Sequence, residues 1–176
     1  WERCFDTTDF RNSYELVEAI EFSNFLHITF HYLIVKEEQI VAIIPCYIQS
    51  TYLDIIAPDS IHKVCNKIRK FFTSFFEIKT FIVGIPIATC SGLLGVSAIP
   101  TKNFAQIMHE IVSQLQKATL QHRAKFIVVK EVEEDNVAFI KEHFSPSFNL
   151  LPSQTTAYIP LKKNSSYVTR LRKHYR

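Results

Sequence analysis

The sequence predicts an α/β fold, with one mixed central sheet flanked by helices on both faces. Three observations predict it. Hydrophobic residues make up 47% of the 176 residues and charged residues 21%, a composition that excludes a disordered chain. Two β-rich runs near the start are joined by a short charged turn, as in an antiparallel hairpin. From residue 78 onward strand-like and helix-like segments alternate, and we expect residues 1–161 to form a single domain.

A helix and a hairpin are predicted first. Asn12 stands three residues before Glu15, which is the capping-box spacing, so a helix is expected to begin there. The strands of the hairpin are expected over His31 to Lys36 and Gln39 to Gln49. Pro45 within the second strand predicts a bulge or a local break in the pairing.

A third strand and a second helix are predicted next. The strand covers residues 51–57, and Asp59 or Ser60 caps the helix that follows. One side of this helix carries lysines and an arginine. The other side carries the apolar residues that we expect to be buried, which are Ile61, Val64, Ile68, Phe71, Phe72 and Phe75.

The second half begins with a continuous apolar run, Phe81 to Ile87, which predicts a strand covered on both faces. The clearest helix follows, from Asn103 to Gln121, because apolar residues recur there at spacings of three and four. Its apolar stripe comprises Phe104, Ile107, Met108, Ile111, Val112, Leu115 and Ala118. The remaining predicted elements are a buried strand over Lys125 to Val132, a short helix over Asn136 to Phe144 and a strand over Gln154 to Leu161.

The positive charge is concentrated in residues 162–176. This segment carries six Lys and Arg and no acid, which leaves the preceding residues with 14 basic against 17 acidic groups. The segment is predicted to form a basic helix with Tyr167 and Tyr175 among its cations. Such a helix predicts contact with nucleic-acid phosphates and bases, or else a solvated helix that packs on its own body or on a partner.

The cysteines and histidines do not predict a metal site. The four cysteines show no CxxC pairing, so we expect reduced thiols, Cys90 as a packing residue and a cytoplasmic protein. The seven histidines include no HExxH motif. No segment approaches the roughly 18 apolar residues of a membrane span, and none is expected.

Two regions carry candidate chemistry. Gly92 and Gly95 lie between a strand and a helix, where backbone amides can hold a pyrophosphate, with a tight turn as the alternative. His143 near a helix end is a candidate acid or base, and Glu131 at a strand end is a candidate base if burial raises its pKa. Solvated surface positions are the alternative for both side chains.

From residue 78 onward the order of elements resembles the acyl-CoA N-acyltransferase (GNAT) superfamily. Three stretches are similar to its FemAB-like branch, whose members transfer amino acids or acyl groups in peptidoglycan and related pathways: Tyr32 to Gln49, Ile85 to Val96 and Tyr158 to Arg176. The resemblance implies a GNAT-like sheet, acetyl-CoA or another acyl-CoA as donor, and an amine-bearing acceptor. It also implies a donor loop whose cofactor-binding residues are Ser91, Gly92, Gly95, Val96 and Ser97.

The sequence departs from the family pattern at two places. The polar residue that leads the pyrophosphate signature is missing before Gly92, and the position of the general-acid tyrosine falls on Phe139 or His143. In this branch the last segment begins a helix that connects two GNAT-like halves. The resemblance therefore implies a degenerate N-terminal half, with residues 162–176 as the start of the connection and a second half or another copy of the chain as partner.

Two functions stay open at this point, together with a third alternative in which the Phe-rich helix over Ile61 to Phe76 is a protein-interaction surface. One is an N-acyltransferase, or its N-terminal half, that moves an acyl or aminoacyl group to an amine with Glu131 and His143 as acid and base. The other is a non-catalytic GNAT-like binding module whose basic segment 162–176 contacts nucleic acid or an acidic protein.

Overall fold

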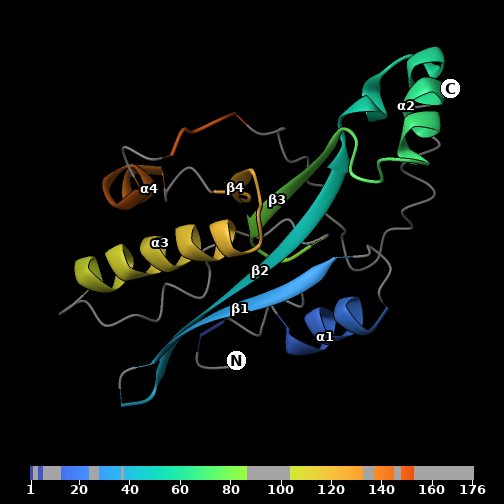
Figure 1. Ribbon diagram of the computed structural model, residues 1–176. Helices are drawn as coiled ribbons and strands as arrows, with labels where there is room; N and C mark the ends of the chain where they lie inside the picture. The colour runs from blue at the N-terminus through green and yellow to red at the C-terminus, as the bar shows by residue number, and fades with distance from the viewer. Residues whose placement is uncertain are drawn as a thin grey trace, which may run out of the picture.

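A computed structural model describes residues 1, 4–5, 13–23, 28–36, 38–86, 104–132, 137–144 and 148–152. These residues form an α/β structure in which one mixed sheet lies among helices, which confirms the predicted class (Figure 1). The elements in chain order are α1 (Tyr14–Ser23), β1 (Thr29–Lys36), β2 (Ile40–Tyr52), the 3-10 helix η2 (Leu53–Ile56), α2 (Asp59–Arg69), β3 (Glu77–Val83), α3 (Phe104–Gln121), β4 (Phe126–Val129) and α4 (Val137–Phe144).

The sheet has the strand order β1-β2-β3-β4. Strand β2 pairs antiparallel with both β1 and β3, and β3 pairs in parallel with β4. Helix α3 lies between these two strands in the sequence, as a parallel connection requires. The predicted hairpin and the predicted strand–helix–strand order are therefore both present.

The prediction of a bulge at Pro45 is wrong. Pro45 lies opposite Tyr32 in an unbroken ladder, and the irregularity falls between Val35 and Lys36. The carbonyl of Pro45 accepts a hydrogen bond from the Gly84 N–H at 2.8 Å, so the polar groups of this residue face β3. Because the missing N–H faces the same way, its loss does not affect the pairing with β1.

The main hydrophobic core lies between the sheet and α3. The apolar stripe predicted for α3 is confirmed, because three of its residues are buried and the other four pack against the buried cluster. The buried cluster consists of Ala42, Ile44, Cys46, Phe81, Val83, Met108, Ile111, Leu115 and Phe144. Since Phe144 belongs to α4, this helix covers the same face of the sheet as α3.

Helix α1 covers part of the opposite face. Val17 and Ile20 form a second buried cluster with Ile85, and Phe30 packs against it. The Ser13 hydroxyl accepts the N–H of Leu16 at 3.2 Å and so caps this helix. The predicted cap Asn12 lies outside the described residues.

Two strand boundaries differ from the prediction. Residues 51–57 do not form a separate strand, because β2 continues to Tyr52 and η2 follows. Strand β3 begins at Glu77 and ends at Val83, several residues before the predicted ends, since pairing with the far end of β2 extends it backward. Gly84 then takes a positive φ of 136°, which ends the strand.

The prediction of a buried strand over Lys125 to Val132 holds for one face of β4 only. Ile127 and Val129 pack on the main core, whereas Phe126 and Val128 on the other face are exposed. Helix α1 lies over the β1 side of that face and leaves the β4 side open (Figure 1).

The predicted buried side of α2 is wrong for four of its six residues, whereas Ile68 and Phe75 are half-buried. Ile61 and Val64 are exposed, as are Phe71 and Phe72 just after the helix. The helix faces the protein instead with Cys65, which is buried. A period of 3.6 residues predicts a helix with an apolar side, but it does not show what covers that side.

The predicted strand over 154–161 and the basic helix over 162–176 lie outside the described residues. Within the described part of the chain, no helix combines the length and the apolar character needed to traverse a bilayer.

Candidate functional site

Strands β3 and β4 pair over a short distance and then separate. Thr80 to Val83 lie opposite Phe126 to Val129. The last backbone hydrogen bond of this pairing runs from the Lys130 N–H to the Val83 carbonyl, at 3.0 Å. Gly84, the first residue after β3, directs its N–H to the Pro45 carbonyl of β2, as the alternation along a strand requires. In the described residues, the pairing of β3 with β4 ends at Val83 and Val129.

Glu131 lies at the point where the strands separate, in a left-handed conformation with φ 55°. Arg123 also has a positive φ, but there the conformation ends α3, and the Ala124 N–H bonds back to the Thr119 carbonyl at 3.0 Å. Glu131 follows a strand, where this conformation serves no helix end. A non-glycine residue in this region costs on the order of 1–3 kcal/mol, and such positions cluster at functional sites.

Tyr47 of β2 lies opposite Ile82 of β3, and the negative charge of Glu131 acts on its hydroxyl. Tyr47 is 5% exposed, and burial chiefly, together with the negative charge of Glu131, raises the pKa of its hydroxyl. The Lys130 ammonium donates to the Ile85 carbonyl at 3.4 Å and so lies at the same separation. A carboxylate, a phenol and an ammonium thus come from segments around the end of the β3–β4 pairing, and we call Tyr47, Lys130 and Glu131 the separation site.

The predicted donor-loop residues lie outside the described residues. They fall between Pro86, the last described residue after β3, and Phe104, the first residue of α3. The cofactor-binding role of these residues therefore stays a prediction; they are Ser91, Gly92, Gly95, Val96 and Ser97.

His143 lies on α4, where its ring meets the edge of Phe104 at 5.5 Å between centroids. Helix α4 packs on the face of the sheet that α3 covers. Tyr47 follows Cys46 of that core, so it points to the opposite face. His143 and Tyr47 therefore belong to different faces of the sheet.

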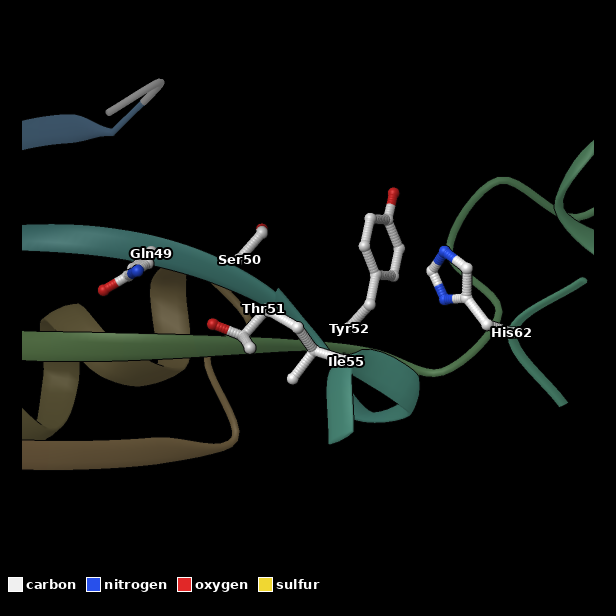
Figure 2. Close-up of a pocket in the computed structure, with 6 residues that line it drawn as sticks. All are labelled: Gln49, Ser50, Thr51, Tyr52, Ile55 and His62. Atoms are coloured by element: carbon white, nitrogen blue, oxygen red, sulfur yellow. The ribbon is translucent and has the colours of Figure 1, made fainter. Parts of the chain in front are cut away.

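A shallow hollow of about 310 Å³ lies elsewhere, between the end of β2 and α2 (Figure 2). The side chains of Tyr52 and His62 stand next to each other along it, and Ile55 of η2 lies below them. Its lining consists of Gln49, Ser50, Thr51, Tyr52, Ile55 and His62.

The buried carboxylate of Asp54 holds α2 beside this hollow. Arg69 donates to both of its oxygens, and the Nδ1 of His62 lies 2.9 Å from Oδ2. Because Arg69 donates these hydrogen bonds, the pKa of Asp54 falls to about 2. An ionised carboxylate only accepts, so His62 carries its hydrogen on Nδ1. With its charge balanced by Arg69, Asp54 serves as a structural anchor.

Sequence reasoning did not single out Tyr47 or Asp54. Asp54 is the one charged residue between Gln39 and Pro58, an isolated acid in an apolar stretch. That isolation is a usable signal, because an acid there is either paired or forced to the surface. Tyr47 has no such signal, since its role depends on Glu131, which is distant in the sequence.

The described cysteines Cys4, Cys46 and Cys65 are free and buried. Burial raises the pKa of the Cys46 thiol to about 12, so it is not a nucleophile near neutral pH. Cys90 lies outside the described residues. Within the described ranges, no three His, Cys, Asp or Glu side chains are grouped so as to hold a metal ion.

In comparisons with known proteins, the sequence matches no family model and has no significant match among curated proteins or solved structures.

Proposed function

We propose that this chain is a GNAT-like acyl-transfer domain, which moves an acyl or aminoacyl group from a thioester donor to an amine. The observation that supports the proposal most is the short parallel pairing of β3 and β4, which ends at Val83 and Val129, two residues before Glu131. In the GNAT fold, the donor enters between two such strands. The order β3, α3, β4, α4 is also the one that the resemblance implies.

The proposed reaction uses two groups of the separation site. The acceptor nitrogen attacks the carbonyl carbon of the donor, and the Glu131 carboxylate takes the proton that the nitrogen loses. The carbon–sulfur bond then breaks, and the Tyr47 hydroxyl gives its proton to the leaving thiolate. A raised pKa keeps Tyr47 protonated until that step. His143 takes no part in this scheme, because it lies on the other face of the sheet.

The donor is treated as a substrate, acetyl-CoA or another acyl-CoA. Its pyrophosphate is proposed to bind the backbone amides of Ser91, Gly92, Gly95, Val96 and Ser97, which connect the separated end of β3 to α3. The acceptor amine is proposed to approach along the β4 side of the sheet, where Phe126 and Val128 are exposed.

Calorimetry with acetyl-CoA and an assay of CoA release with a panel of amines test the proposal. We expect heat of binding for the wild-type chain. Glu131→Gln and Tyr47→Phe should keep that binding and lower the rate of transfer by about 10²–10⁴-fold, the usual contribution of a general base or acid.

Two matched variants serve as controls. Glu142→Gln changes an exposed glutamate of α4, and Tyr32→Phe removes a hydroxyl that donates to Glu21 at 2.9 Å. Both should leave the rate unchanged. Absence of heat at millimolar acetyl-CoA contradicts the proposal. Salt-dependent binding of tRNA that is lost on deletion of residues 162–176 would then favour the non-catalytic binding module.

A further inference from the structure

The segment between β2 and β3, residues 53–76, forms a projecting unit that we call the tip. It contains η2, α2 and the turn over residues 70–76. Figure 1 shows it at the far end of the long strands β2 and β3, away from α3 and α4. A backbone hydrogen bond of 2.9 Å from the Leu53 N–H to the Phe76 carbonyl closes its base.

Polar contacts hold the tip together. Arg69 binds the Asp54 carboxylate, donates from Nε to the Phe75 carbonyl at 3.1 Å and lies 3.9 Å from the centre of the Tyr52 ring. His62 and Cys65 lie on the same inner side of α2, because residues 62, 65 and 69 follow helical spacing. The apolar residues on the outer side are therefore not needed to fix the helix.

Large apolar side chains cover the outside of the tip. Ile55 and Ile56 before α2 are 74% and 91% exposed, and Phe71 and Phe72 after it are 83% and 69% exposed. Leu53, Ile61, Val64 and Phe76 are exposed as well. Contiguous exposed apolar surface of this kind marks an interaction site.

Lysines lie next to this apolar surface. Lys63, Lys67 and Lys70 are exposed and follow helical spacing along α2, beside the apolar stripe of Ile61 and Val64. The tip contains two acids, of which Asp54 is neutralised by Arg69. The outer surface of the tip is therefore both apolar and positively charged. It is complementary to a partner surface in which an anionic outer layer covers an apolar interior.

We propose that the tip docks on the surface of an anionic lipid bilayer. Its bulky residues come from the two segments that flank α2 at the end of an extended arm, a projecting arrangement suited to entering the boundary between headgroups and acyl chains. The lysine ammoniums stay with the lipid phosphates while their aliphatic stems lie along the apolar surface. This inference does not depend on the proposed acyl-transfer activity.

Sedimentation with vesicles of phosphatidylcholine, with and without phosphatidylserine, tests this inference on the full chain. We expect binding to the anionic vesicles that weakens with added salt. The double variant Phe71→Ala/Phe72→Ala should weaken binding by about tenfold or more, because two exposed rings no longer enter the lipid. The triple variant Lys63→Gln/Lys67→Gln/Lys70→Gln should weaken it by about tenfold or more and reduce the salt dependence.

Matched changes outside the tip separate docking from general effects. Leu120→Ala/Phe126→Ala removes two exposed apolar side chains, and Lys79→Gln/Lys117→Gln/Lys125→Gln removes three exposed lysines. These controls should bind vesicles as the wild type does, and the basic segment 162–176 is present in every variant. Equal binding by all variants, or no binding by the wild type, overturns the inference. Self-association in sedimentation velocity that is lost only in the Phe71/Phe72 variant overturns it in favour of a second copy as the occupant.

Discussion

Helices α3 and α2 both carry an apolar stripe, but the two stripes have opposite surroundings. Met108, Ile111 and Leu115 of α3 are buried against the sheet. Ile61 and Val64 of α2 point outward. Helix α3 is thus fixed by apolar burial, which is spread over many contacts.

Helix α2 is fixed by one carboxylate and the two side chains that bind it. Asp54 receives hydrogen bonds from Arg69 and faces His62, and these contacts connect α2 to η2. A helix held in this way leaves its apolar side free for another surface. An amphipathic helix can thus bury its apolar side in the core, as α3 does, or expose that side on the surface, as α2 does.

The largest expected effect is on the α3 side. Leu115→Ala removes a buried side chain from the main core and should lower the free energy of unfolding by about 2–5 kcal/mol, measured by urea denaturation. Leu120→Ala, an exposed leucine of the same helix, serves as the control and should change it by less than about 0.5 kcal/mol. Equal losses in the two variants would show that α3 is not packed as described.

The second effect should be confined to the tip. Asp54→Asn removes the charge that Arg69 and His62 face, so the amides of α2 should exchange with solvent about tenfold faster or more at neutral pH. The amides of α3 should keep their protection. If both helices lose protection together, the tip and the core are one cooperative unit and the comparison fails.

The same contacts give a pH dependence with a defined sign. The pKa of Asp54 is about 2 in the folded chain, against an ordinary value of 3.8. A lowered carboxyl pKa stabilises the fold above pH 3.8, and this stabilisation is lost as the pH falls from there to about 2. Resonances of α2 followed by NMR in the wild type should therefore change over this range. The Asp54→Asn variant should not show that transition.

The smallest effect is expected for the exposed stripe of α2. Val64→Ala should change the free energy of unfolding by less than about 0.5 kcal/mol, because the side chain is exposed. Thermal denaturation followed by circular dichroism measures this change. Val17→Ala, which removes part of a buried side chain of α1, serves as the destabilised reference. A loss as large as that of Val17→Ala would mean that the outer side of α2 is covered after all.

The fold is predictable where the signal is local. The period of α3 and the two β-rich runs of the hairpin each lie in one continuous stretch of sequence, which is sufficient to predict these elements. The ends of β3 are not predictable, because they depend on pairing with the far end of β2, and the outward side of α2 depends on Asp54 and Arg69 in separate segments. These features depend on contacts between residues that are distant in the sequence, and the periodicity of a single segment does not predict such contacts.

The candidate site is predictable only in part. The position of Glu131 at a strand end predicts a base, and the structure places this residue where β3 and β4 separate. Tyr47 is not predictable in the same way, because its place opposite Ile82 of β3 is set by the order of the strands in the sheet. The donor-loop assignments, Gly92 and Gly95 among them, remain predictions.

The bond between Leu53 and Phe76 completes the ladder of β2 and β3 before the tip begins. The ends of β2 and β3 from which the tip projects are thus held together by strand pairing, and not by contacts within the tip. A segment attached at such a base can change in length or composition at small entropic cost to the scaffold. Replacing the tip with another insert at this base would change the docking surface and leave the sheet intact.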